Sequence, residues 1–152
     1  MSMTQEEQQQ SKLTVKELMI PAEKVAHVQG NNPLEHALLV LVKSGYFAVP
    51  VLDSSYRLVG SISKTTILDQ ILGIDGYETD KLSDMTVQDV MDTEVVSIHH
   101  DATFIEGLKV LIDAAYACVI DEAGLFDGIL TRRAILKEVN KNYYHSRYAK
   151  KI

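Results

Sequence analysis

An internal duplication constrains the fold of this chain more than any other feature of its sequence. Residues 60–68, GSISKTTIL, return as residues 128–136, GILTRRAIL. Residues 14–19, TVKELM, return as residues 86–91, TVQDVM. Self-similarity of this kind indicates that one structural unit occurs twice. We therefore expect two copies of one small fold in tandem.

Each half shows the same order of secondary-structure signals. The β-branched segments 24–28 and 94–98 predict a first strand, and apolar residues at helical spacing predict a helix over 34–42 and over 104–112. Two strands follow, at 46–52 and from Gly60 in one half, and at 116–120 and from Gly128 in the other. A second amphipathic helix then runs through 67–72 or 135–139. The pattern predicts an α+β protein of two β-α-β-β-α repeats.

Capping residues mark where these helices begin. Asn32 and Thr103 each precede a glutamate by three residues, the spacing of a capping box, and Pro33 suits the first helical position. The predicted boundaries are a disordered N-terminal segment at 1–13, repeat 1 at 14–73, a glycine-containing linker at 74–85, repeat 2 at 86–142, and a C-terminal tail at 143–152. The tail mixes basic and aromatic residues and is interpreted as a solvated helix end.

Composition excludes several classes of function. The net charge of -6 disfavours a nucleic-acid or anionic-membrane binder, and the apolar run at 37–42 is far shorter than the roughly 20 residues of a spanning helix. The N-terminus does not resemble a secretory signal, and Cys118 is the only cysteine, so a cytoplasmic protein is expected. No nucleophile and base constellation or phosphate-binding glycine loop is present, so we predict no catalytic residues and no enzyme.

Histidine and cysteine carry no predicted chemistry. His99 and His100 are adjacent, but neither a cysteine nor an acidic residue stands at metal-ligand spacing from them in the sequence. No metal site and no cofactor are therefore predicted. Cys118 lies among apolar strand residues, so it is expected to be buried and inert.

The segment Thr131-Arg132-Arg133 is electrostatically unusual. Thr131 is placed to cap a helix, so both arginines fall in its first turn, where the helix dipole disfavours cations by about 0.3–1 kcal/mol each. Only four arginines exist in the chain, and these two are adjacent. An anion at this point would offset the cost, because helix N-termini and guanidinium groups both bind phosphate. We predict a phosphate-binding site here.

The duplicated pattern resembles a pair of CBS domains, over roughly residues 14–142. The resemblance rests on two motifs. One is residues 45–50, GYFAVP, which contain the strand predicted from residue 46, and the other is the glycine-led strand that ends in Ser63 or Thr131. It implies a pseudo-two-fold pair of repeats that dimerises into a disc-like module. CBS pairs bind adenosine-containing ligands such as AMP, ATP or S-adenosylmethionine between the repeats.

This chain departs from the nucleotide motif of that family. The motif reads Ser/Thr-x-x-Asp, and its aspartate accepts hydrogen bonds from the ribose hydroxyls, whereas this chain has Thr66 and Ala134 at the two positions. A cyclic dinucleotide has an esterified 3′ oxygen and brings a phosphate close, so arginine suits it better than a carboxylate. The amino-acid sequence at residues 24–28, 34–41 and 131–133 is similar to that of the stand-alone bacterial cyclic-di-AMP-binding CBS proteins of the DarB/CbpB type.

This resemblance implies a non-enzymatic regulator whose ligand is cyclic di-AMP, with weak AMP or ATP binding. The ligand-binding residues it implies are Lys24, Ala26, Tyr46, Phe47, Ala48, Thr131, Arg132 and Arg133. Implied partners are a second copy of the chain and target proteins such as an alarmone ((p)ppGpp) synthetase/hydrolase of the stringent response or pyruvate carboxylase. A sensor of AMP, ATP or NAD and a purely structural dimerisation module remain alternatives.

Overall fold

The structure is a computed structural model that describes residues 5, 8 and 12–149, with side chains described up to residue 144. The chain forms two compact units. The first-repeat unit contains residues 25–95 and 123–126, and the second-repeat unit contains residues 96–122 and 127–149 together with the described residues up to 24. The units cross the sequence repeats, because residues 14–24 of the first repeat fold with the second and residues 86–95 fold with the first.

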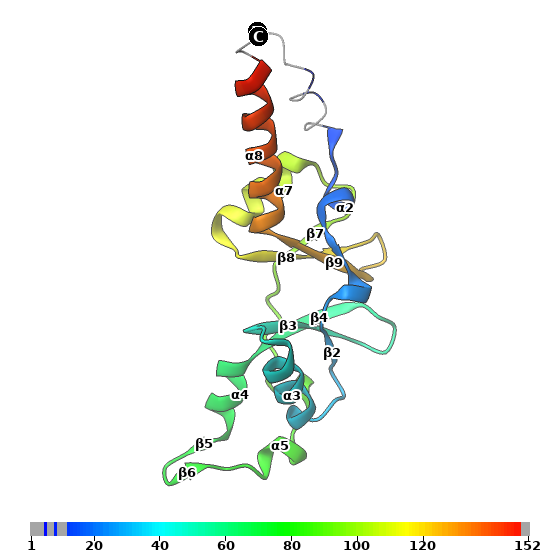
Figure 1. The fold of residues 1–152 in the computed structure, drawn as a ribbon. Helices are drawn as coiled ribbons and strands as arrows, with labels where there is room; N and C mark the ends of the chain where they lie inside the picture. Colours follow the sequence, from blue (N-terminus) through cyan, green and yellow to red (C-terminus); the bar gives the residue numbers. More distant parts are fainter. Residues whose placement is uncertain (1–4, 6–7, 9–11, 150–152) are drawn as a thin grey trace. The chain divides into compact units, whose positions relative to one another are not determined.

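The first-repeat unit is a three-stranded sheet with its helices on one face (Figure 1). Its elements are β2 (Val28–Gln29), α3 (Leu34–Ser44), β3 (Ala48–Leu52), β4 (Leu58–Ser63) and α4 (Lys64–Ile71). β3 pairs in parallel with β2 and antiparallel with β4. Fully buried residues such as Leu34, Leu41 and Ile67 pack the helices onto the sheet.

The second-repeat unit repeats this arrangement. Its elements are α2 (Val15–Leu18), β1 (Ile20–Pro21), β7 (Ser97–His99), α7 (Phe104–Asp113), β8 (Tyr116–Ile120), β9 (Phe126–Thr131) and α8 (Arg132–Ala149). The sheet order is β1-β9-β8-β7, with β7 parallel to β8. Phe104, Leu111 and Ile135 form its core where Leu34, Leu41 and Ile67 form the other. The predicted α+β fold of two β-α-β-β-α repeats is confirmed.

The glycine that opens each duplicated strand has a steric reason. A Cβ at Gly128 would overlap the carbonyl oxygen of Ile20, because β1 lies directly against β9. A Cβ at Gly60 would lie 2.7 Å from the carbonyl oxygen of Asp92, whose backbone exchanges hydrogen bonds with Ser61. Each repeat therefore contributes an arm to the sheet of the other, and the glycines make room for these arms.

Shorter elements connect these parts. They are the 3-10 helix η1 (Ala22–Lys24), the hairpin of β5 (Leu72–Gly73) and β6 (Gly76–Tyr77), α5 (Lys81–Asp84) and α6 (Val87–Val90). β6 and α5 fall within the predicted linker at 74–85, β5 lies directly before it at the end of the predicted repeat 1, and α8 continues into the predicted tail. Most of the N-terminal segment 1–13 lies outside the described residues. Among the described helices, none combines the length and the apolar character that a membrane crossing needs.

Three local predictions are wrong. The strand expected at 24–28 begins only at Val28, because Ala22–Lys24 form a 3-10 helix, and the strand expected at 94–98 begins only at Ser97. The N-cap of α3 is Pro33 and not Asn32, whose side-chain oxygen instead accepts a hydrogen bond from the Gln29 N–H at 2.8 Å. The capping box of Thr103 and Glu106 at α7 is confirmed.

Candidate functional site

The N-terminus of α8 is built by a hydroxyl cap. The Thr131 hydroxyl accepts a hydrogen bond from the Ala134 N–H at 3.2 Å. Ser63 does the same for α4, accepting from the Thr66 N–H at 3.1 Å. The first turns of α4 and α8 contain no acidic residue, so both helices begin without a carboxylate at the position that the CBS nucleotide motif uses. Backbone N–H groups at such ends favour an anion.

Arg132 is held by the end of the neighbouring helix. Its Nε donates to the carbonyl oxygen of Leu111 at 2.8 Å, and its Nη2 donates to that of Ile112 at 3.2 Å. Both carbonyls belong to the last turn of α7, the negative end of that helix dipole. The unfavourable position of Arg132 at the start of α8 is therefore offset within the chain. A guanidinium has five N–H groups, so three remain available for a ligand.

Arg133 differs from its neighbour. It is exposed, and its side chain makes no hydrogen bond or ion pair with any residue that the structure describes. Its charge stands in the first turn of α8 without a carboxylate beside it. Arg133 consequently favours an anion at this helix end more strongly than Arg132 does.

Tyr46, Phe47 and Ala48 lie together where β3 begins. The carbonyl oxygen of Phe47 accepts a hydrogen bond from the Lys64 N–H at 3.1 Å, and Ala48 pairs with Ser63, so this segment lies against the start of α4. The two aromatic residues are 46% and 67% exposed, which is unusual for rings of this size. They offer surfaces on which a planar base can stack.

Lys24 and Ala26 lie on either side of the division between the units. Lys24 ends η1 and is exposed, whereas Ala26 is half-buried against the core of the first-repeat unit. Of the eight predicted residues, the first-repeat unit thus holds Ala26, Tyr46, Phe47 and Ala48, and the second-repeat unit holds Lys24, Thr131, Arg132 and Arg133. Within each unit the structure brings together one consecutive group, residues 46–48 and residues 131–133.

A pocket of about 300 Å³ opens in the first-repeat unit. It is lined by Gly30, Asn31, Leu52, Asp53, Ser54, Val59, Gln88 and Met91. None of the eight predicted ligand residues takes part in it.

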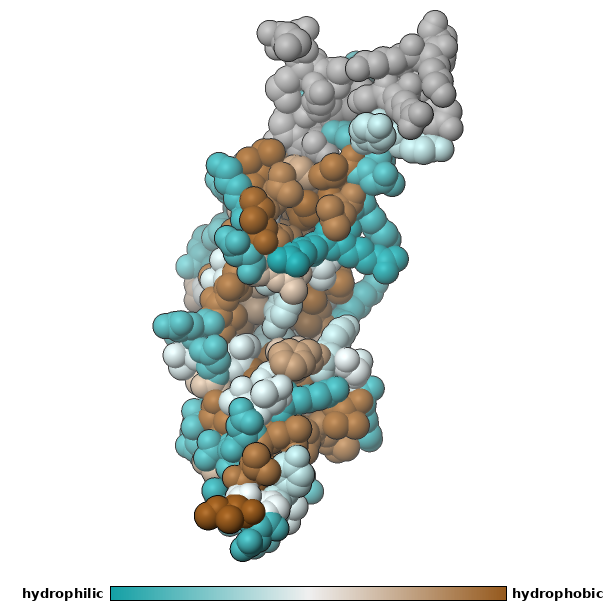
Figure 2. All heavy atoms as spheres, turned by 90° about the vertical axis from the view of Figure 1, so that its left-hand side faces the viewer, coloured by the Kyte–Doolittle hydropathy of each residue, from teal (hydrophilic) through white to brown (hydrophobic). Residues whose placement is uncertain are grey.

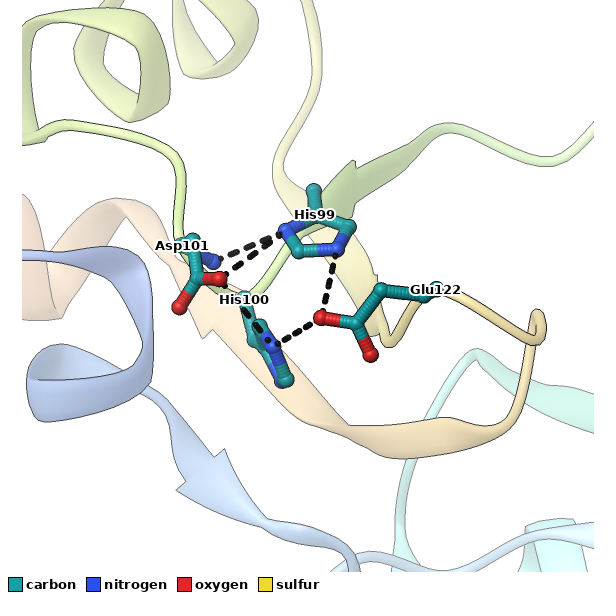
Figure 3. A group of neighbouring side chains, drawn as sticks. All are labelled: His99, His100, Asp101 and Glu122. Atoms are coloured by element: carbon teal, nitrogen blue, oxygen red, sulfur yellow. Dashed lines mark hydrogen bonds and ion pairs between the residues drawn. The ribbon is translucent and has the colours of Figure 1, made fainter.

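The structure brings acidic groups to the histidines in a way that the sequence did not reveal (Figure 3). His99, His100, Asp101 and Glu122 each place a possible ligand atom within 4.8 Å of those of the others. The prediction that no acidic group lies at metal-ligand spacing from these histidines is therefore wrong for the folded chain. Glu122 follows β8, and the pairing of β8 with β7 brings it next to them. The hydrogen bond to Asp127 raises the pKa of His100, with smaller contributions from Asp101 and Glu122.

Cys118 is fully buried in β8. Burial raises the pKa of its thiol to about 12. A thiol held protonated in this way is a poor nucleophile.

Comparison with known proteins agrees with the duplicated architecture. The model of the CBS domain matches residues 15–73 and again residues 87–141. The chain belongs to the CBS domain family. Its two copies of the domain correspond to the two repeats seen in the sequence, and the resemblance stated above is confirmed.

Several relatives of this tandem CBS protein share most of its length. Cyclic di-AMP receptor B of Bacillus subtilis (strain 168) is 47% identical over 129 residues, which is 85% of this chain and 88% of the receptor. A crystal structure of a CBS domain protein from Bacillus anthracis is 51% identical, with a TM-score of 0.80 over 88% of this chain and 97% of the other. The CbpB protein of Listeria monocytogenes in complex with c-di-AMP is 46% identical, with a TM-score of 0.77 over 86% and 97%.

Proposed function

We propose that this protein is a cyclic di-AMP receptor that acts without catalysis in the cytoplasm. One observation carries the proposal: the chain is 47% identical, over 85% of its length, to a curated cyclic di-AMP receptor. A relative of 46% identity with the same fold has been solved with c-di-AMP. A receptor of this kind needs only to bind its ligand better in one functional state than in another.

The residue roles follow from charge and exposure. Arg133 supplies an exposed guanidinium, without a partner among the described residues, for one phosphodiester. Arg132 is fixed on the carbonyls of Leu111 and Ile112 and presents its remaining N–H groups without losing freedom on binding. Thr131 holds the helix end to which both arginines belong.

The other predicted residues are proposed to bind the adenine bases. Tyr46 and Phe47 offer the exposed rings for stacking. Lys24, Ala26 and Ala48 contribute side chain or backbone to the same ligand.

The first turns of α4 and α8 support a cyclic dinucleotide over a mononucleotide. A carboxylate in place of Thr66 or Ala134 would accept hydrogen bonds from the two ribose hydroxyls of AMP or ATP. Neither first turn contains a carboxylate. The ribose of a cyclic dinucleotide has a free hydroxyl fewer, because its 3′ oxygen is esterified. We therefore propose that AMP, ATP and NAD bind weakly.

Titration calorimetry and thermal shift with a ligand panel test this function. The panel contains cyclic di-AMP, cyclic di-GMP, AMP, ATP and NAD at equal concentrations. Cyclic di-AMP should give saturable binding and the largest rise in melting temperature, since a ligand of the folded state stabilises it by mass action. A response to AMP, ATP or NAD without one to cyclic di-AMP would establish the mononucleotide sensor instead. No response to any nucleotide would leave the structural dimerisation module.

We further propose that the protein is a homodimer. Each repeat leaves an apolar side chain exposed at the same place on its first helix, Val42 on α3 at 61% and Ile112 on α7 at 66%. Leu136 and Val139 on α8 are exposed as well. Figure 2 shows apolar areas, coloured brown, among the polar areas on the surface of each unit. Unpaired apolar helix faces are typical of surfaces that a partner covers.

Light scattering coupled to size-exclusion chromatography measures this assembly. The native chain should elute with twice the monomer mass, and the double variant Val42→Glu/Ile112→Glu should elute as a monomer. Ile74→Glu, which changes an apolar residue at the tip of the β5–β6 hairpin, serves as the matched control. A native monomer would refute the dimer.

The proposed protein targets are an alarmone synthetase/hydrolase of the stringent response or pyruvate carboxylase. The support is the resemblance to the DarB/CbpB group. Purified target and receptor can be mixed with and without cyclic di-AMP and their binding measured by biolayer interferometry. Ligand-dependent binding of either enzyme is the expected result, and binding of neither in both states would exclude these targets.

A further inference from the structure

The cluster of His99, His100, Asp101 and Glu122 lies apart from the residues proposed to bind the nucleotide. It occupies the end of β7 and the turn after β8, within the second-repeat unit (Figure 3). Glu122 Oε1 is 3.4 Å from His99 Nε2 and 3.1 Å from His100 Nε2, and Asp101 Oδ2 is 3.5 Å from His100 Nε2. Four potential ligands thus converge from two segments of the chain.

The duplication shows that this cluster belongs to one repeat only. The His100 N–H donates to the carbonyl of Ile120 as the Gly30 N–H donates to that of Leu52, so His100 stands where the first repeat has Gly30. By the same register Asp101, Glu122 and Asp127 replace Asn31, Ser54 and Val59. Those first-repeat residues line the pocket of about 300 Å³. One scaffold position is therefore a pocket in one repeat and a group of potential metal ligands in the other.

The partly buried contact with Asp127 selects the tautomer of a neutral His100. Its side chain is 14% exposed, and its Nδ1 lies 2.8 Å from Asp127 Oδ2. A carboxylate is only an acceptor, so Nδ1 is the protonated nitrogen and Nε2 of a neutral ring carries a lone pair. A carboxylate that orients a histidine in this way is the usual outer partner of a metal ligand.

In the neutral ring, the lone pair on Nε2 of His100 faces other hydrogen-bond acceptors. Oxygens of Glu122 and Asp101 lie 3.1 and 3.5 Å from Nε2, and atoms that only accept hydrogen bonds repel one another at such distances. With neutral imidazoles, Asp101, Glu122 and Asp127 bring three negative charges to one place. A positive species between the donors removes this repulsion, either a proton on Nε2 or a metal ion.

The spacing of the donors fits a metal ion. Zinc bonds of about 2.0–2.2 Å to nitrogen and oxygen place neighbouring ligands of a tetrahedron roughly 3.3–3.5 Å apart. Three of the observed separations, 3.1, 3.4 and 3.5 Å, lie close to this edge, and all the donor atoms lie within 4.8 Å of one another. Imidazole ligands favour zinc and similar transition ions, whereas magnesium and calcium prefer oxygen alone. We propose that His100, Glu122 and Asp101, with His99, form a binding site for Zn²⁺ or a divalent ion of the same class.

His99 is the weaker member of this site. Its Nδ1 accepts a hydrogen bond from the Asp101 N–H at 3.0 Å, so Nε2 of the neutral ring carries the proton. Coordination through Nε2 needs the other tautomer and gives up that hydrogen bond. His100 needs no such change, so its removal must cost more zinc affinity than removal of His99.

Metal binding would also tie the strands of this unit together. His100 directly follows β7, Glu122 follows β8, and Asp127 belongs to β9. The carbonyl of His100 also accepts the Lys16 N–H at 2.9 Å, which joins the arm from the first repeat to the same point. Zinc bound here should raise the melting temperature of the chain, because it binds the folded state.

The test uses the full-length chain without a histidine tag, freed of metal by chelation and dialysis. Titration calorimetry with Zn²⁺ alone and the visible absorption of bound Co²⁺ report one site per chain. His100→Ala should abolish this binding, and Asp127→Asn should weaken it about ten- to a hundredfold by loss of the orienting carboxylate. His99→Ala should weaken it less than His100→Ala. His36→Ala, an exposed histidine on α3 of the other unit, is the control and should leave binding unchanged.

Circular dichroism checks that each variant remains folded. Absence of saturable zinc binding by the native chain would overturn the proposal. Zinc binding that survives in His100→Ala, or that His36→Ala reduces equally, would also overturn it, since the ion would then lie elsewhere. An excess of Mg²⁺ that displaces zinc would refute the transition-metal selectivity. Nucleotide binding takes no part in these measurements, so the outcome is independent of the function proposed above.

Discussion

Replacing Arg132 or Arg133 by alanine should separate stability from ligand binding at adjacent positions. Arg132 donates two charged hydrogen bonds to the last carbonyls of α7, at 2.8 and 3.2 Å. Buried bonds of this type contribute about 1.5–3 kcal/mol each, and the exposed side chain reduces the pair to roughly 1–2 kcal/mol in total. Arg132→Ala should therefore lower the melting temperature by about 2–8 °C for a domain of this size.

Arg133→Ala removes a side chain without a partner among the described residues, so the free energy of unfolding should change by less than about 0.5 kcal/mol. Its affinity for cyclic di-AMP should nevertheless fall about ten- to a hundredfold, because a charged hydrogen bond to phosphate is lost. Calorimetry measures the affinity and differential scanning fluorimetry the stability, with Arg57→Ala as the control for loss of a positive charge. Equal losses of stability in both variants, or unchanged affinity in Arg133→Ala, would refute this reasoning.

Three further predictions concern the scaffold. Gly128→Ala should destabilise the chain by about 1–3 kcal/mol, measured by urea unfolding, because its methyl group would overlap the Ile20 carbonyl; a neutral Gly128→Ala would contradict the close approach of β1 and β9. Cys118, with a thiol pKa of about 12, should not react with a disulfide reagent at pH 8 until the chain is unfolded, and rapid reaction of the native chain would show that β8 opens. The Thr86 backbone N–H lowers the pKa of Asp89, so its stabilising contribution is complete above the unfolded value of about 3.9 and is lost as the pH falls through the folded value. Native chain and Asp89→Ala should thus differ in urea midpoint at pH 7 and converge in acid, and a constant difference would contradict this.

The secondary structure follows from local patterns to a large extent. The strand predicted at 116–120 matches β8, Tyr116–Ile120, and the apolar spacing of residues 104–112 places α7 within one residue of its observed end. The caps Thr103 and Thr131 act as predicted, because a hydroxyl beside a helix start has a short-range partner in the N–H three residues on. Where two local signals competed, at Asn32 and Pro33, the prediction placed the helix start one residue early.

Contacts between segments that are distant along the chain could not be predicted from the sequence. Nothing local indicates that Ile20 lies against Gly128, or that Asp92 pairs with Ser61, since these arms cross from one repeat to the sheet of the other. The partner of Arg132 escaped for the same reason, because Leu111 and Ile112 are about twenty positions away along the chain. The end of α7 thus offsets the charge of Arg132, and an anion is needed to offset only that of Arg133.

The sequence by itself determined that the chain contains two tandem β-α-β-β-α repeats, because duplication, capping residues and apolar spacing are all local or periodic signals, and the CBS family entered as a resemblance of the motifs. The tertiary structure alone decided which charges remain free and which side chains meet. It assigned Arg132 to the α7 terminus and left Arg133 exposed, and it gathered His99, His100, Asp101 and Glu122 at the edge of one sheet. The physical reason is that strand pairing joins residues far apart in sequence, and burial and electrostatic pairing depend on that pairing.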